Sequence, residues 1–502
     1  MNRYSPTPCC RYACAAILIA LSMAPRAAGQ AKTQVGEVAV LPIAIPSSSA
    51  SVPGTRSLPI DLASALKLAN ANPLDIALAR ERVAAARAQH DRASVQWIPN
   101  LNWGVDYFRH DGQLQDVVGK VFPTNKSSFL VGGGPSLSVA TGDAFYAPLA
   151  ARQIVAARQA TVQATANDAA LEVATTYFNV QQARGELAGA IDAAARSADL
   201  VEKTKQLAPG LIPSVEINRA KAEHARRRLA IEAAYERWQL ASADLVRLLR
   251  LDATAILHPI EEPHLRVELI DASCSTEELV ALGLTHRPEL AAHQAAIQAT
   301  LARIRQEKLR PWMPNLVLRG TASATPGLSS GYFGGGVNSD LSNFSGRNSM
   351  DLQAIWTFDN LGFGNRAAVR ERQAESRIAQ LELLRFQDRV VSELVQAQAR
   401  VRRAANRAEL AEEGLRDAIE SADKNVKGLG QTRRIGEQVT LVLRPQEVVS
   451  SIAALDLAYR EYYGAIADLN RGQFALYRAL GNPSCALPGS VRLLAPVPTE
   501  TP

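Results

Sequence analysis

The sequence predicts an α+β membrane protein with an internal tandem repeat, in which long helices continue into membrane-spanning β-strands. The pentapeptide W-I-P-N-L at 97–101 returns as W-M-P-N-L at 312–316. Each copy is followed by segments in which apolar and polar residues alternate, which is the period of a strand. A very long helical segment without internal stop signals then follows each pair of strands. The order helix, strand, strand and helical hairpin therefore occurs twice.

The two pentapeptides are predicted to mark helix-to-strand junctions. In both copies another proline lies 26 residues before the proline of the pentapeptide. It opens a helical stretch rich in Ala and Arg, at 73–95 and at 288–310. The proline inside the pentapeptide then ends that helix, because it lacks an N–H and clashes with the preceding turn. The predicted junction residues are Trp97, Pro99, Trp312 and Pro314.

The segments after each junction have the pattern of membrane strands. In the first copy, Leu101, Trp103 and Val105 share one face, and in the second copy Leu352 and Trp356 do. An apolar face of about ten residues is what a tilted strand needs to cross a bilayer. Trp103 and Trp356 are expected to anchor at the membrane–water interface, with local packing as the alternative. The polar segments 108–127 and 320–348 are predicted as loops between strands.

Four helical segments are expected, in two hairpins. Apolar residues recur in steps of three and four, which is the spacing of a coiled-coil seam, from Ile231 to Leu248 and from Ile452 to Leu469. A helix of sixty residues would reach about 90 Å, too far for one compact globule. The predicted segments are 148–207, 213–252, 365–430 and 440–481.

One chain supplies only four membrane-type strands, and open strand edges are forbidden in lipid. Several chains must therefore share one barrel. A trimer would give twelve strands, four from each protomer.

The N-terminus is expected to be a cleaved secretory signal, since a basic start is followed by about twelve apolar residues and by small residues before Gln30. No later segment offers 18 consecutive uncharged apolar residues. The expected organisation is a signal peptide at 1–29, an extended linker at 30–60, repeats at 61–270 and 271–486, and a tail at 487–502.

Two cysteines, Cys274 and Cys485, remain after the signal. An exported protein can oxidise them. A Cys274–Cys485 disulfide and two unpaired thiols both fit the sequence, because sequence alone does not bring Cα atoms within bonding range.

The sequence predicts no enzyme, no catalytic residues and no cofactor. It contains no phosphate-binding loop and no nucleophile–base arrangement. The loop from His258 to His264 holds two histidines and two glutamates, but structural metal sites usually have tighter ligand pairs, so no metal is predicted. Basic residues do not cluster with stacking aromatics, which argues against a nucleic-acid partner.

Three features of the sequence occur together: the tandem repeat, the Pro-Asn-Leu junctions, and the repeat ends at 245–251 and 476–481. In this combination the sequence resembles the outer-membrane factor family, the TolC-like channels of Gram-negative bacteria. The resemblance covers about 60–482. It implies a homotrimeric tunnel in the outer membrane, in contact with its lipid, with a large periplasmic part. The fold class that it implies is a long α-helical coiled-coil barrel continuous with a transmembrane β-barrel, with four strands per protomer and twelve per trimer. Such a tunnel docks on a periplasmic adaptor (membrane fusion) protein and an inner-membrane pump.

The family resemblance also implies that the helical hairpins turn at a periplasmic tip that contacts the adaptor. The residues that match these turns are Gly210, Glu216, Arg433, Arg434 and Gly436. Each of these residues also has a simpler interpretation. The glycines would be ordinary helix caps. Glu216 would be a solvated acid at a helix N-terminus, and the two arginines would form a solvated basic face. Where the family often carries aspartate, the second turn has Val442 and Pro445, so an acidic gating ring is not expected.

Three functions remain open. The first is an exit duct of a tripartite efflux system for small toxic compounds or metal ions. The second is the outer-membrane channel of type I protein secretion. The third, of another class, is a periplasmic coiled-coil scaffold that never inserts in a membrane.

Overall fold

The computed structural model describes residues 56–71, 73–208, 212–271, 274–321, 330–337, 344–346, 349–435, 438–481 and 492–494. All of them belong to one compact unit, 48–502. The predicted signal peptide, Gly210, Gly436 and Cys485 lie outside the described residues. The predicted disulfide therefore stays a prediction.

The helices follow the predicted repeat closely. Each half of the chain has a short helix, a helix that leads into strands, and a hairpin of two long helices. In the first half these are α2 Leu62–Ala71, α3 Leu74–Ser94, α4 Thr141–Leu207 and α5 Ser214–Leu249. In the second half they are α6 Thr276–His286, α7 Pro288–Leu309, α8 Phe363–Gly428 and α9 Pro445–Ala479.

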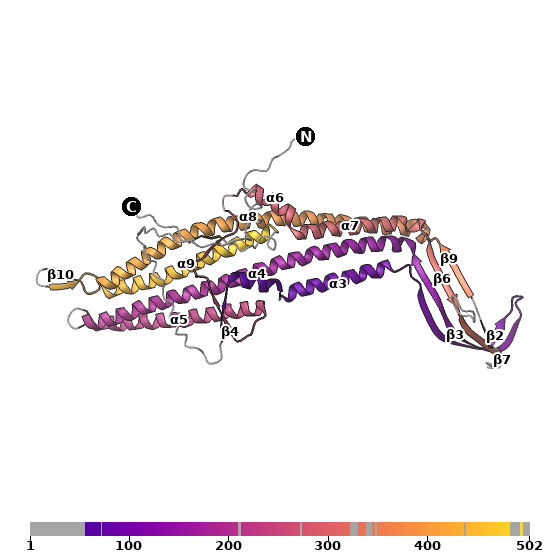
Figure 1. Ribbon diagram of the computed structural model, residues 1–502, viewed down its shortest axis with the longest axis horizontal. Helices are drawn as coiled ribbons and strands as arrows, with labels where there is room; N and C mark the ends of the chain where they lie inside the picture. Colours follow the sequence, from indigo (N-terminus) through magenta and orange to yellow (C-terminus); the bar gives the residue numbers. More distant parts are fainter. Residues whose placement is uncertain are drawn as a thin grey trace, which may run out of the picture. The chain divides into compact units, whose positions relative to one another are not determined.

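Helix α4 is the central element of the helical part. It packs against α3 and α5 of its own repeat and against α7 and α9 of the second repeat. Helix α8 packs against α6, α7 and α9. Figure 1 shows these helices side by side, with the strands beyond the ends of α3, α4, α7 and α8.

Six of the strands form one antiparallel sheet. Its order is β8-β7-β3-β6-β9, and β2 pairs with the other edge of β3. Strand β3 therefore pairs with β2 on one side, and on the other side with β6 near the helices and β7 further out. The bounds are β2 Asn100–Gln115, β3 Val121–Ala140, β6 Asn315–Thr321, β7 Ser330–Val337, β8 Phe344–Gly346 and β9 Ser349–Ile355.

The predicted loops 108–127 and 320–348 are both wrong. The described part of 320–348 contains β7, β8 and the end of β6. Most of 108–127 is a β-hairpin. Strands β2 and β3 stay paired to Gln115 and Val121. The turn between them is closed by Asp116, whose carboxylate accepts hydrogen bonds from the Val118 and Lys120 amides at 3.0 and 2.8 Å. Backbone pairing carries polar residues into the strands. In the second copy, β9 ends at Ile355, so Trp356 lies just after the strand rather than in it.

Three two-stranded sheets complete the fold. Strand β1 (Arg56–Ile60), at the end of the predicted linker, runs parallel to β4 (Ala255–Pro259). Strand β12 (Arg492–Leu494) pairs with β5 (Arg266–Glu268). The α8–α9 turn holds the antiparallel pair β10 (Thr432–Ile435) and β11 (Gln438–Leu441).

The predicted helix seams are the core of the helical part. Ala234 and Leu245 of α5 and Ile452 and Leu455 of α9 are fully buried. Their regular steps of three and four let the two long helices of each hairpin pack along their length. Within the described residues, no helix combines the length and apolar content of a transmembrane span.

Candidate functional site

Each helix-to-strand junction holds the sheet against the helices. Pro99 comes directly before β2, and Pro314 directly before β6. The Thr141 hydroxyl, at the start of α4, donates to the Pro314 carbonyl at 2.8 Å. Arg310 and Asp143 form an ion pair at 2.9 Å. The first long helix of one repeat is therefore fastened to the junction of the other.

Aromatic side chains gather at these junctions. Trp97 meets Phe145 edge-to-face with ring centroids 5.2 Å apart. The Trp356 indole donates to the Trp312 carbonyl at 3.3 Å. Trp312 and Trp356 are more than half exposed, which suits an interface between water and lipid.

Apolar side chains of β2 stand in contact with solvent. Leu101, Trp103, Val105 and Tyr107, two residues apart, are 53–82% exposed. A soluble protein rarely exposes so regular an apolar row. Trp103 in this row is 77% exposed.

The first tip turn is partly described. Glu216 lies in the first turn of α5 and pairs with Arg219 one turn later, at 2.5 Å. This pairing fits the simpler reading of a helix-terminal acid. Gly210 lies outside the described residues.

The second tip turn differs from a simple helical hairpin. Arg433 and Arg434 lie on β10, opposite Thr440 and Val439 of β11. Helix α9 then begins at Pro445, whose fixed φ suits the first helical position. The predicted helix start near residue 440 is therefore five residues early, because the turn is a short β-hairpin.

Four side chains near the tip join the hairpins of the two repeats, and we call them the tip lock: Asp192 and Arg196 of α4, Asp423 of α8 and Tyr459 of α9. Arg196 pairs with Asp192 at 2.8 Å and also with Asp423. The Tyr459 hydroxyl donates to Asp192 at 3.1 Å. Burial and the nearby Asp192 raise the pKa of Tyr459. Its hydroxyl therefore stays protonated and donates this hydrogen bond. Sequence reasoning missed this cluster, since its members are far apart in the chain.

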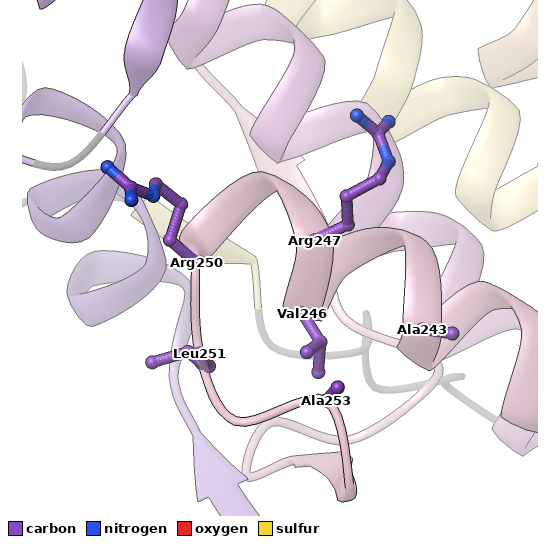
Figure 2. Close-up of a pocket in the computed structure, with 6 residues that line it drawn as sticks. All are labelled: Ala243, Val246, Arg247, Arg250, Leu251 and Ala253. Carbon is purple, nitrogen blue, oxygen red and sulfur yellow. The ribbon is translucent and has the colours of Figure 1, made fainter.

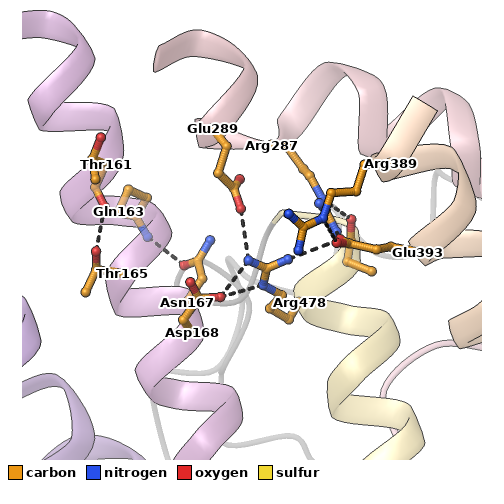
Figure 3. Close-up of polar contacts among 11 residues, drawn as sticks. Thr161, Gln163, Thr165, Asn167, Asp168, Arg287, Glu289, Arg389, Glu393 and Arg478 are labelled. Atoms are coloured by element: carbon orange, nitrogen blue, oxygen red, sulfur yellow. Dashed lines mark hydrogen bonds and ion pairs between the residues drawn. The ribbon is translucent and has the colours of Figure 1, made fainter. Parts of the chain in front are cut away.

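A second charged cluster joins the repeats further from the tip (Figure 3). Arg478 of α9 pairs with Asp168 of α4 at 2.6 Å, with Glu289 of α7 at 3.0 Å and with Glu393 of α8 at 3.4 Å. The nearly buried Arg287 also pairs with Glu393, at 2.7 Å. One arginine thus fixes the positions of three helices around α9.

The histidine- and glutamate-containing loop has a structural role. Glu261 accepts the Leu62 amide at 2.8 Å and the Tyr177 hydroxyl. Burial and Glu261 raise the pKa of Tyr177, which stays protonated. Among the described residues, no group of three or more His, Cys, Asp or Glu side chains is placed to hold a metal ion.

Cys274 lies at the surface of the second repeat's core, next to the start of α6. Its carbonyl accepts hydrogen bonds from Gln398 and Arg402 of α8, at 2.8 and 3.1 Å. The backbone of Cys274 thus helps to hold α6 on α8.

Long helical hairpins that continue into an antiparallel sheet define the TolC-like outer-membrane channel fold. Residues 65–249 match the family model described as outer membrane efflux protein. This stretch of the chain therefore resembles the outer membrane efflux proteins, a family of channels of the Gram-negative outer membrane that have a large periplasmic helical part.

Solved structures share the fold at low sequence identity. The outer membrane protein VceC of Vibrio cholerae is 15% identical with a TM-score of 0.63, over 84% of this chain and 96% of that one. The CmeC channel of Campylobacter jejuni is 14% identical with a TM-score of 0.66, over 84% and 85%. The open-state MtrE channel of Neisseria gonorrhoeae is 16% identical with a TM-score of 0.63, over 84% and 88%. No curated protein matches the chain.

Proposed function

We propose that the chain is the exit duct of a tripartite efflux system. Three copies form a tunnel that docks on a periplasmic adaptor and an inner-membrane pump, and small toxic compounds or metal ions leave through it. The observation that carries the proposal is the pair of outer strands, β2 and β9, in the part of the sheet next to the helices, where the strand order is β2, β3, β6 and β9.

Strands β2 and β9 have the directions that pairing between two copies requires. Along the order β2, β3, β6 and β9, each strand is antiparallel to its neighbour. Strands β2 and β9 therefore run in opposite directions, so β9 of one copy can pair antiparallel with β2 of the next. Pairing of this head-to-tail kind closes into a ring. Closure would also satisfy the edge backbone groups, which lipid cannot do.

The helical tip is the part proposed to meet the adaptor. The first hairpin ends between Leu207 of α4 and Ser214 of α5, and the second between Gly428 of α8 and Pro445 of α9. Tips on rigid elements commonly bind partners. Glu216, Arg433 and Arg434, with Gly210 and Gly436, are proposed as the docking residues. The duct itself is passive, and the pump supplies the energy.

The first test is the native mass of protein extracted with detergent from fractionated envelopes. A trimer from the outer-membrane fraction is the expected result. A soluble periplasmic species would contradict the duct and favour a coiled-coil scaffold.

The cargo is tested by deleting the gene. We expect the deletion strain to retain small toxic compounds and to become sensitive to them, with recovery on expression of the full chain. Unchanged sensitivity with loss of a secreted protein from the medium would assign the duct to type I secretion.

A further inference from the structure

The end of the β2–β3 hairpin has no neighbouring strand among the described residues. Strands β2 and β3 stay paired as far as Gln115 and Val121. Strand β7 accompanies β3 only up to Lys126. The segments beyond it, Asp111–Gln115 and Val121–Asn125, form a two-stranded ribbon whose edges are free in the described part of the chain. Such a ribbon is marginally stable alone in water, so its structure favours a further partner.

The two faces of β2 differ in polarity next to the helices. The exposed apolar row from Leu101 to Tyr107 lies on one face, and the polar residues Asn102 and Asp106 lie on the other. In a membrane strand the apolar face meets lipid and the polar face meets the lumen. The face of Asn102 and Asp106 is therefore the lumen face of the proposed duct.

This polarity is reversed beyond Tyr107. The lipid-side face now carries Arg109 and Asp111, which form an ion pair at 2.6 Å, so this part of the strand lies beyond the lipid, on the side away from the helices. The lumen-side face carries Leu114, and Phe122 lies directly opposite Leu114 on β3. Leu114 and Phe122 are 36% and 41% exposed. An exposed apolar pair thus lies on the lumen side of the ribbon.

The turn at the end of the ribbon is apolar as well. Asp116 fixes this turn by accepting hydrogen bonds from the backbone, and Val117 and Val118 within it are almost fully exposed. Loops that face only water are usually polar, whereas contiguous exposed apolar residues indicate a contact surface. We call the four residues the apolar tip: Leu114, Val117, Val118 and Phe122.

The ribbon is long enough to bring the apolar tip to the axis of a trimeric duct. Twelve strands about 4.8 Å apart and tilted by about 40° form a ring with a radius of about 12 Å. The residue pairs from Asp111 to Gln115 extend for about 17 Å at about 3.4 Å per residue. Because Leu114 and Phe122 lie on the lumen side, the tips of three copies face one another across the mouth.

We propose that the apolar tips of three copies meet over the outer mouth of the duct and form an outer gate. The proposal rests on the proposed trimeric duct, and the partner of each tip is the same tip of the other two copies. The contact removes apolar side chains from water. It also makes an apolar constriction, which excludes water and ions by dewetting. Cargo that arrives from the helical part displaces the ribbons, which no other described strand holds in place.

Cysteine cross-linking tests whether the tips meet. In a full-length background with Cys274→Ser and Cys485→Ser, Leu114→Cys is treated in intact cells with a short thiol-specific bismaleimide. We expect covalent dimers on a denaturing gel, because one thiol per copy joins two of the three copies. The matched control is Gln113→Cys, which is exposed on the opposite face of the same strand and should stay monomeric.

Access to the lumen from outside tests whether the tips close the mouth. In the same background, Asp106→Cys places a thiol on the lumen face of β2, and a maleimide that does not cross membranes is added to intact cells. We expect Leu114→Ser combined with Phe122→Ser to speed the labelling of this thiol by about tenfold or more, because the buried apolar contacts are lost. Gln113→Ser is the matched control and should leave the rate unchanged.

A thiol on the helical part measures any label that crosses the outer membrane. Ala253 lines an open surface hollow of about 440 Å³ at the end of α5, beside Val246 and Leu251 (Figure 2). In the proposed duct this hollow lies on the periplasmic side. The rate at Asp106→Cys is therefore taken as the excess over the rate at Ala253→Cys in equally treated cells.

The outcomes separate the outer gate from the duct. A native trimer in which Leu114→Cys links no better than Gln113→Cys would overturn the gate and leave the duct intact. The same holds if the two serine substitutions leave the labelling rate of Asp106→Cys unchanged. A wild-type protein that is monomeric in the outer membrane would overturn the duct, and the gate with it.

Discussion

Two glycines of α4 let α9 approach closely. A Cβ added at Gly185 would lie 2.5 Å from the Tyr463 ring, and one added at Gly189 would lie 2.5 Å from the Tyr459 ring. Neither ring can move away easily, because the Tyr459 and Tyr463 rings also stack on each other, with centroids 6.3 Å apart. The sequence does not reveal this, since glycine in a helix has no pattern that names its neighbour.

We expect Gly189→Ala to lower the free energy of unfolding by about 1–3 kcal/mol, because overpacking forces side chains and backbone to shift. The control is Gly414→Ala on α8, where a Cβ would meet nothing within 4 Å. That change should stabilise the helix by about 0.5–1 kcal/mol. Thermal unfolding followed by circular dichroism measures both. If Gly189→Ala changed the free energy of unfolding in the same direction and by the same amount as Gly414→Ala, the contact with Tyr459 would not be the cause.

The Arg478 cluster gives the protein an acid sensitivity. Although partial burial alone would raise the pKa of Glu393, hydrogen bonds and charges from Arg287, Arg389 and Arg478 hold it below its usual value of 4.5. The folded pKa is lowered, so this stabilisation is present above pH 4.5 and is lost as the pH falls below it. We expect Glu393→Gln to lower stability at pH 7 by about 1 kcal/mol and to shrink the loss between pH 4.5 and 3. Urea unfolding at several pH values measures this. A pH dependence identical to that of the wild type would contradict it.

At the scale of elements, helices were more predictable than strands. The long helices fell within a few residues of their predicted bounds, except α4 and α9, because seams with steps of three and four extend over many turns. Helix α4 begins at Thr141 rather than 148, since Pro148 is tolerated inside it. Strands β2 and β3 continue through His110, Asp111 and Lys126, whose polar character on both faces hides the period of two. Backbone pairing with a distant strand decides such segments.

The junction prolines separate helix from strand, and we expect Pro99→Ala and Pro314→Ala each to lower the yield of trimer. Alanine would let α3 or the short helix before β6 continue toward the strand, which shifts the start of β2 or β6. The measurement is the fraction of trimer by native mass after detergent extraction. Pro148→Ala is the control, because it removes a proline inside α4 and restores a backbone donor. Unchanged yield in both junction variants would count against their role.

At the scale of the whole molecule, the repeat could be read from the sequence and the contacts between repeats could not. Two pentapeptides and two helix seams were enough to predict the order of the elements. Some ion pairs that join the repeats link residues more than 200 positions apart, such as Arg196 with Asp423 and Arg227 with Asp456. No local pattern encodes such a pair, because it depends on how two helices are rotated against each other.

The tip lock joins the hairpins of the two repeats through contacts of Arg196 with Asp423 and of Tyr459 with Asp192. In the proposed duct, an opening in which α8 and α9 move relative to α4 would break these contacts. Loss of a charge-assisted hydrogen bond costs about 1.5–3 kcal/mol. A change of that size shifts an equilibrium between closed and open states by about tenfold or more.

We therefore expect Arg196→Ala combined with Tyr459→Phe to raise the open probability of single channels in planar bilayers, without loss of trimer. Lys205→Ala is the control, since among the described residues the ion-pair partner of Lys205 is Glu202 of the same helix, at 3.2 Å. It removes a charge from that helix but no contact between hairpins. If the control opened the channel as much as the double variant, the effect would come from net charge at the tip. If neither variant changed the conductance, the tip lock would be a structural contact rather than part of the gate.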